Sequence, residues 1–144
     1  MSVVVRSAGK GDIALVLNLW AVGGENASRP DDRAEAVEAL LGRDPEALIL
    51  AEVDGALAGS VIAGWDGWRY HLYRLAVHPD YRRKGVATVL LDRAEQRLVE
   101  LGASRIDAMV LDDNDLGQSI WAARGYHRQS EWSRWVKEPP RSSG

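Results

Sequence analysis

The sequence predicts one α/β domain in which helices cover both faces of a mixed β-sheet. Short apolar or β-branched runs alternate with segments whose apolar residues recur at helical spacing. Asp54-Gly55 separates two early runs, as in an antiparallel hairpin, whereas helical segments separate the later runs, as in β-α-β crossings. The chain has 144 residues and no internal repeat, so we expect a single domain over residues 1–137 and a disordered tail over residues 138–144.

The first half of the chain is expected to contain four strands and two helices. Apolar residues from Ile13 to Trp20 form one helical stripe, which Asp12 can cap and Gly23-Gly24 ends. Proline and acidic residues suit the first turn of a helix, so Pro30 to Asp32 indicate the start of the second helix. The expected strands are residues 3–5, 48–53, 57–63 and 70–77.

The second half is expected to alternate helices and strands. Apolar spacing from Lys84 to Leu101 predicts a long helix, and Gly102 is a stop signal. The remaining expected elements are a strand over residues 106–111, a short helix between Asn114 and Gly125, and a last strand over residues 126–136.

Composition excludes several classes of function. The chain has 18 basic and 21 acidic residues, which argues against a nucleic-acid partner. It has no cysteine, so disulfides, thiolate zinc sites and a cysteine nucleophile are excluded, and no other metal-ligand spacing stands out. We see no signal-peptide pattern and no apolar run near the ~18 residues of a membrane span. We therefore expect a cytoplasmic protein with no metal, no nucleic-acid partner and no membrane partner.

The segment from Leu75 to Thr88 has the strongest chemical signal. A strand ends, a basic loop follows, and a long helix begins inside an Arg-x-x-Gly-x-Ala pattern. Backbone N–H groups at a helix N-terminus lack partners and have partial positive charge, so they bind phosphate. Gly85 permits close approach of the backbone. An isolated match of this kind also fits a basic loop before an amphipathic helix, and the patterns of a P-loop and of a dinucleotide fingerprint are absent.

This segment resembles the acetyl-CoA signature of the GCN5-related N-acetyltransferases, the GNAT family. The family pattern is roughly Val-x-Pro-x-x-Arg-x-x-Gly-x-Gly/Ala. The matching residues are Val77, Pro79, Arg82, Gly85 and Ala87.

A second family element follows at its expected distance, with Asn114, a short helix, and Gly125-Tyr126 in place of the usual Gly-Phe. Residues 47–126 resemble the bacterial YpeA-type branch in particular. The resemblance implies the GNAT fold, with a mixed central sheet of six to seven strands flanked by about four helices.

The resemblance implies that acetyl-CoA is the acyl donor. The strand backbone at Leu75, Ala76 and Val77 matches the positions that pair with the pantetheine arm. Asn114 matches a position that contacts this arm or caps the following helix, and both roles fit. The residues that match the pyrophosphate site are Arg82, Arg83, Lys84, Gly85, Val86, Ala87 and Thr88.

The implied reaction is direct attack of an amine on the thioester, with a base for the ammonium proton and an acid for the thiolate. Most of the family uses a tyrosine as the acid, and Trp121 stands at this position. Because indole is too weak an acid, we expect Trp121 to pack against the cofactor arm. A thiol that titrates near about 8.5 is still a tolerable leaving group.

His71 is the expected base, because it matches the catalytic glutamate of the histone-acetylating branch. An unperturbed imidazole also titrates near neutral pH. Tyr73 shares its strand face and completes the catalytic assignment. Asp107 is a second candidate for the base, and a water chain without a dedicated base is a third.

The acceptor is an unidentified amine. Its pocket is expected to include residues 24–29, the second helix and the turn from Trp65 to Arg69. Acidic side chains there would attract a cation, and Trp65 and Trp68 would hold it by cation–π contact. A solvated loop with two packing aromatic residues fits equally well. The acidic candidates are Glu25, Asp31, Asp32 and Asp66.

Two other functions stay open. One is an acyl-CoA-binding module with little or no catalysis, which Trp121 suggests, and the other is nucleic-acid binding through the short basic cluster. The oligomeric state is also open, with a homodimer as one option.

Overall fold

The computed structural model describes residues 2–24 and 31–140. The chain divides into two compact units, Met1–Leu111 and Asp112–Gly144. The single domain over residues 1–137 and the disordered tail over residues 138–144 stay predictions. Residues 25–30, which include most of the predicted acceptor loop and Glu25, and residues 141–144 of the tail lie outside the described residues.

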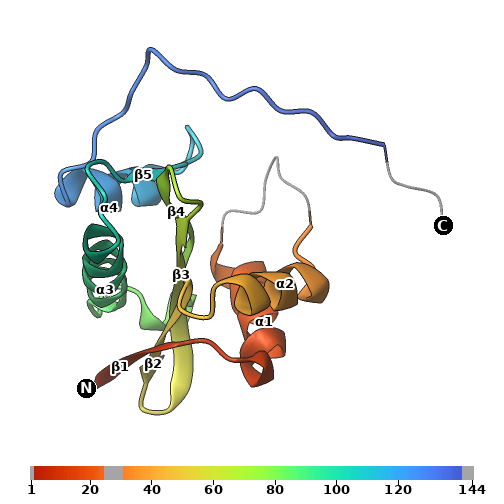
Figure 1. Ribbon diagram of the computed structural model, residues 1–144. Helices are drawn as coiled ribbons and strands as arrows, with labels where there is room; N and C mark the ends of the chain where they lie inside the picture. The colour runs from red at the N-terminus through yellow and green to blue at the C-terminus, as the bar shows by residue number, and fades with distance from the viewer. Residues whose placement is uncertain (1, 25–30, 141–144) are drawn as a thin grey trace. The chain divides into compact units, whose positions relative to one another are not determined.

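The first unit is built on a five-stranded sheet in the order β1-β2-β3-β4-β5 (Figure 1). The first four strands pair antiparallel with their sequence neighbours, and β5 joins parallel to β4. The sheet is therefore mixed, as predicted. The strands are β1 (Val3–Ser7), β2 (Leu48–Val53), β3 (Ala56–Trp65), β4 (Tyr70–Val77) and β5 (Asp107–Ala108).

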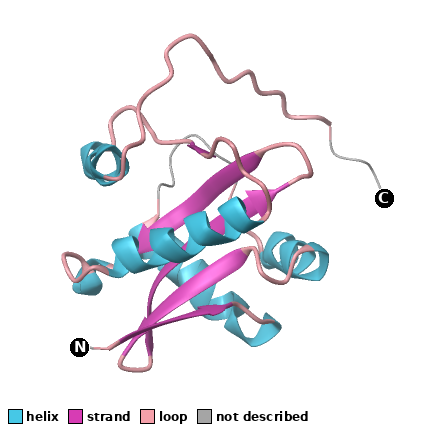
Figure 2. Cartoon of the chain, turned by 60° about the vertical axis from the view of Figure 1, so that its left-hand side comes forward, coloured by secondary structure: helices cyan, strands magenta, loops and turns pink. Residues whose placement is uncertain are grey.

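Helices cover both faces of this sheet (Figures 1 and 2). One face packs against α1 (Ile13–Gly23) and α2 (Ala34–Arg43), in a core to which α1 contributes Val16 and Trp20 and the sheet contributes Leu50 and Ala76. The other face packs against α3 (Val86–Glu100). A Cβ built on Gly59 of β3 would lie 2.8 Å from Val86 Cγ1, so α3 lies directly on the strand there. Two short 3₁₀ turns, η1 (Lys10–Asp12) and η2 (Pro79–Tyr81), precede α1 and α3.

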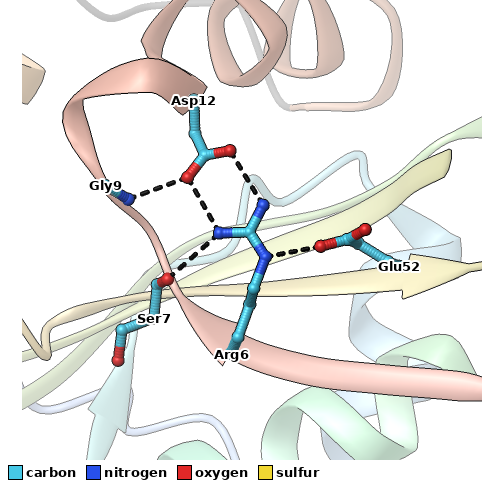
Figure 3. A network of polar contacts seen from close by, with 5 residues as sticks. All are labelled: Arg6, Ser7, Gly9, Asp12 and Glu52. Carbon is cyan, nitrogen blue, oxygen red and sulfur yellow. Dashed lines mark hydrogen bonds and ion pairs between the residues drawn. The ribbon is translucent and has the colours of Figure 1, made fainter. Parts of the chain in front are cut away.

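Asp12 lies at the predicted N-cap position of α1, but its side chain makes no capping hydrogen bond to this helix. Its carboxylate instead accepts hydrogen bonds from the Gly9 N–H at 2.8 Å and from both Nη atoms of Arg6 at 2.9 and 2.8 Å (Figure 3). Arg6 also bonds Glu52 through Nε and the Ser7 carbonyl oxygen through Nη1. The hydrogen bonds from Arg6 lower the pKa of Asp12 from 3.8 to about 2. The Asp12 carboxylate therefore connects η1 to Arg6 of β1, and Arg6 continues the connection to Glu52 of β2.

The second unit consists of α4 (Asp115–Ala123) and an irregular segment. Asn114 caps the helix, because its Oδ1 accepts a hydrogen bond from the Gly117 N–H at 2.9 Å. Gly125 ends it with a φ of +91°, and the Tyr126 N–H then donates to the Trp121 carbonyl oxygen at 3.0 Å. The predicted caps at both ends of this helix are confirmed.

Two predictions about strands are wrong. The sheet has five strands rather than six to seven, because residues 126–136 form no strand. Alternating side chains make a strand only where a neighbouring backbone completes the ladder, and every side chain from His127 to Pro140 is exposed. The strand predicted at residues 106–111 is confined to Asp107–Ala108.

Candidate active site

The end of β4, η2 and the start of α3 bring the predicted phosphate-binding residues together in one continuous turn. Val89 N–H donates to the Gly85 carbonyl oxygen at 3.1 Å, which closes the first helical turn. The N–H groups of Val86, Ala87 and Thr88 lie before this turn closes, so they have no hydrogen-bond acceptor within α3. Arg82, Arg83 and Lys84 are exposed beside them. We call residues 82–88 the cradle, since they combine helix-terminal N–H groups with three cations.

Gly85 is needed for its backbone conformation rather than for space. Its φ is +78°, in the left-handed region, and it is the N-cap residue of α3. A Cβ built there would meet no atom within 4 Å. The structure thus gives a reason for glycine at this position, because this φ is costly for residues with a side chain. Close approach of the backbone to a ligand stays a prediction.

The two edges of β4 differ. Its pairing with β3 runs from Tyr70↔Trp65 to Val77↔Gly59, whereas β5 pairs only at His71↔Asp107 and Leu72↔Ala108. Past Leu72, no strand of residues 2–24 or 31–140 pairs with the edge of β4 that faces away from β3. We call this edge, over Leu75–Val77, the open edge. It contains the three positions expected to pair with a pantetheine arm.

A β-bulge lies where the open edge begins. Arg74 and Leu75 together oppose Val61, and Arg74 has a φ of +51°. Bulges bend a strand and interrupt its ladder, so this one accounts for the early end of the β4–β5 pairing and the short β5. The Arg74 carbonyl oxygen accepts a hydrogen bond from Ser60 Oγ at 2.9 Å. Because the peptide plane is trans, the Leu75 N–H points the opposite way, away from Ser60. No motif in the sequence indicates Arg74 or Ser60 as a site residue.

His71 and Asp107 form a pair across β4 and β5. They are register partners, and His71 Nδ1 is hydrogen-bonded to Asp107 Oδ1. The His71 side chain is 21% exposed and that of Asp107 is 43% exposed. When Asp107 is ionised, Nδ1 holds the imidazole proton and Nε2 keeps the lone pair. The two residues that the sequence offered as alternative bases are therefore hydrogen-bonded to each other.

Tyr73 lies beside this pair, with its ring centroid 5.5 Å from that of His71. Tyr73 opposes Ile62, which packs against the core under α1 and α2, so His71 and Tyr73 share that face. The predicted shared strand face of the two residues agrees with this register.

Similarity to known proteins identifies the family. The model of the acetyltransferase (GNAT) family matches residues 15–126. The chain belongs to the GNAT family of acetyltransferases. It is 37% identical over 128 residues to an acetyltransferase of Yersinia enterocolitica, with 87% of this chain and 88% of that protein covered. The resemblance found in the sequence is confirmed, and this relative is bacterial.

Solved structures show the same fold. AAC(6')-Iy, in complex with a CoA-containing bisubstrate analogue, superposes with a TM-score of 0.74 at 21% identity, with 99% and 100% of the two chains covered. YncA of Salmonella typhimurium, a putative acetyltransferase determined with acetyl-CoA, gives a TM-score of 0.71 at 19% identity, with 87% and 79% covered. The GNAT fold predicted for this chain is confirmed.

In this GNAT protein, Trp121 packs within the second unit. Its side chain is 8% exposed, and its ring meets the edge of Tyr126 at a centroid distance of 5.0 Å. Gly125-Tyr126, which replaces the usual Gly-Phe of the family, thus supplies an aromatic partner for Trp121. The contacts of Trp121 and Asn114 with a cofactor arm stay predictions.

The hairpin between β3 and β4 separates the two tryptophans of the predicted acceptor pocket. Trp65 stacks on Tyr70 at 6.5 Å, and the Tyr70 hydroxyl reaches the Leu101 carbonyl oxygen past the end of α3. Trp65 therefore belongs to the α3 face, opposite to His71. Trp68 is 83% exposed at the tip of the hairpin.

Asp66 organises this hairpin tip. Its Oδ1 accepts hydrogen bonds from the Arg69 N–H at 2.7 Å and the Trp68 N–H at 2.8 Å. These two backbone bonds lower the pKa of Asp66, with a smaller contribution from the charge of His71. Asp66 is thus an anion on the hairpin that precedes His71.

Two general properties complete the description. In the described ranges no helix is long and apolar enough to cross a membrane. The same part of the chain contains no group of three histidine, aspartate or glutamate side chains that could hold a metal ion.

Proposed function

We propose that this protein transfers an acetyl group from acetyl-CoA to a primary amine of a small molecule, a peptide or a protein. The observation that supports this best is the junction of the open edge of β4 with the cradle. Along one continuous segment, an unpaired strand edge leads into a helix N-terminus with three cations. This order suits an acyl donor that has amides in its arm and a pyrophosphate at its far end.

The residues present fit this donor. The cradle would hold the pyrophosphate through the N–H groups of Val86, Ala87 and Thr88 and through its basic side chains. Leu75 and Val77 would pair with the amides of the pantetheine arm, as a strand added to the sheet edge. The Leu75 N–H, which points away from Ser60, would donate to the acyl oxygen as negative charge develops there.

His71 and Asp107 would supply the base. In the proposed step, the nitrogen lone pair of a neutral amine forms the new C–N bond as the C–S bond breaks. His71 Nε2 accepts the proton that the amine nitrogen loses, and Asp107 stabilises the resulting imidazolium. The thiolate leaves and takes a proton from water, because Trp121 has no acidic proton to offer. Tyr73 lies beside His71 and would contact the acceptor.

The acceptor is proposed to approach on the face that His71 and Tyr73 share. Asp66 and the exposed face of Trp68 would attract an ammonium group there. The ammonium loses one proton to solvent before the attack, and His71 takes the second. Trp65 is left out of this proposal because it stacks on the opposite face. A homodimer and a cytoplasmic location stay predictions.

The first test is thermal unfolding with acetyl-CoA, with ATP as the phosphate control. Ligand at 100 times its Kd adds about 2.7 kcal/mol, so the unfolding temperature should rise by about 5–10 °C. A rise with acetyl-CoA alone supports the donor site. An unchanged temperature at millimolar acetyl-CoA would contradict it.

The second test is transfer of labelled acetyl to a panel of small amines, peptides and basic proteins. Product with any amine supports the enzyme. Binding of acetyl-CoA without transfer to any member of the panel would favour the alternative that Trp121 suggests, an acyl-CoA-binding module with little catalysis.

A further inference from the structure

Ser60 has none of its surface exposed, and it is the one buried polar residue in the part of the chain that the structure describes. Its hydroxyl accepts a hydrogen bond from Trp20 Nε1 at 2.8 Å and donates one to the Arg74 carbonyl oxygen at 2.9 Å. Ser60 therefore links the indole of Trp20 on α1 to the backbone of Arg74 on β4. A buried hydroxyl is costly unless it is fully bonded, so the geometry of these three groups is tightly constrained.

The bond to Arg74 holds an unusual piece of backbone. Arg74 adopts a left-handed conformation that is rare for residues other than glycine, asparagine and aspartate. Such strain persists only where the surroundings fix it, and it is common at functional sites. Here the fixed group is the peptide between Arg74 and Leu75, which lies at the start of the open edge.

The side chain of Arg74 is fixed as well. Its guanidinium lies 5.6 Å from the ring centroid of Trp20, and its Nη2 donates to Asp32 Oδ1 at 3.0 Å. The Arg74 and Asp32 side chains are 30% and 17% exposed. Trp20 therefore acts on Arg74 in two ways. Its Nε1 is linked to the Arg74 carbonyl oxygen through Ser60, and its ring lies against the Arg74 guanidinium.

We infer that Trp20 and Ser60 are positioning residues, which set the orientation of the Arg74–Leu75 peptide so that the Leu75 N–H faces the acyl oxygen of the donor. Arg74 and Asp32 hold the same bulge from its side-chain end. This inference rests on the proposed function. It adds that catalytic efficiency depends on buried groups of α1 and β3 that contact neither the donor nor the acceptor.

Ser60→Ala tests the inference, with Val16→Ala as the matched control. Val16 is fully buried on α1 in the same core as Trp20, and its apolar side chain makes none of the hydrogen bonds that join Trp20, Ser60 and Arg74. Loss of one oxyanion donor costs about 10²–10³-fold in kcat, and a misdirected donor should cost about tenfold. We therefore expect Ser60→Ala to lower kcat about tenfold with acetyl-CoA affinity within about twofold of the wild type. Val16→Ala should lower the unfolding temperature and leave kcat unchanged at temperatures where it is folded.

Trp20→Phe keeps an aromatic ring under Arg74 and removes the Nε1 donor. It also removes part of a buried ring, a loss of core volume for which Val16→Ala is the control. It should give a smaller fall in kcat than Ser60→Ala, and it keeps the test available if Ser60→Ala does not fold. A second readout needs no turnover. In an NMR titration, the Leu75 amide proton should respond differently to acetyl-CoA and to CoA in the wild type, and this difference should shrink in both variants.

The outcomes separate the inference from the function it rests on. A wild type that binds acetyl-CoA but acetylates no amine overturns the proposed function, and an unchanged Leu75 response in the variants then overturns the inference independently. If the wild type turns over and Ser60→Ala matches Val16→Ala in both kcat and the Leu75 response, only the inference is wrong.

Discussion

The two edges of β4 contrast sharply. On the side of β3, register pairs run from Tyr70 to Val77 with one interruption at the bulge, whereas on the side of β5 they stop after two residues. The edge toward β3 is scaffold, and α3 covers the sheet face there so closely that a Cβ on Gly59 would lie 2.8 Å from Val86 Cγ1. Past the bulge, the other edge leaves backbone groups directed away from the sheet. The contrast teaches that a sheet can make a ligand site by ending a ladder early.

The largest expected effect is on acetyl-CoA binding at the cradle, which follows the open edge of β4. Gly85→Glu places a carboxylate at the proposed phosphate position, where about 4 kcal/mol of repulsion would weaken acetyl-CoA binding about 1,000-fold. Isothermal titration calorimetry measures the Kd of acetyl-CoA for the variant and for the wild type. Gly55→Glu is the matched control, because Gly55 also has a positive φ, of +84°, and an open Cβ direction but lies in the β2–β3 turn. Equal affinities of the two variants would show that the cradle does not bind phosphate.

The second prediction concerns the last residues at which β5 still pairs. His71→Ala should lower kcat about 100-fold and flatten the acid limb of the pH–rate profile, because a general base is lost. Asp107→Asn keeps a hydrogen-bonding partner for Nδ1 but loses the charge, so a fall of about tenfold is expected. A pH–rate profile of His71→Ala with the same acid limb as the wild type would remove His71 as the base.

The third prediction disturbs the packing of α3 on β3, the strand that pairs with the other edge of β4. Gly59→Ala would place Cβ 2.8 Å from Val86 Cγ1, 2.9 Å from Leu90 Cδ1 and 3.0 Å from the Ala76 carbonyl oxygen. Overpacking of this kind costs about 1–3 kcal/mol in the free energy of unfolding, which urea denaturation measures. Gly42→Ala is the control, because its Cβ would meet no atom within 4 Å. Equal stability of both variants would show that α3 can move away from β3 freely.

The smallest effect on function is expected at the other end of the sheet. Arg6 lowers the pKa of Asp12 from 3.8 to about 2, so the unfolded chain takes up this proton first as the pH falls. The stability that this pair contributes is complete above pH 4 and is lost between about pH 4 and 2. Asp12→Asn should be less stable at neutral pH and less sensitive to acid in that window, with unchanged acetyl-CoA affinity. Parallel stability curves of the two proteins from pH 5 to 2 would contradict this assignment.

Local patterns predicted the cradle, because all its residues are neighbours in the sequence. Arg-x-x-Gly-x-Ala at a strand-to-helix junction is enough to orient helix-terminal N–H groups and three cations together. The caps of α4 were predictable for the same reason, since Asn114 and Gly125 act within one turn of chain. His71 was named from its position, but its pairing with Asp107 depends on the β4–β5 register, which joins residues 36 positions apart.

The sequence by itself determined the mixed α/β fold, the element order through α4 and the residues of the cradle. These depend on periodicity, turn chemistry and neighbours in the chain, which are local properties. Only the tertiary structure decided that the β4–β5 ladder stops at Leu72, that residues 126–136 join no strand, and that Ser60 bonds both Trp20 and the Arg74 backbone. Each of these is a contact between distant segments, and a left-handed arginine in a strand has no local signal because the surrounding packing, not its own preference, holds it there.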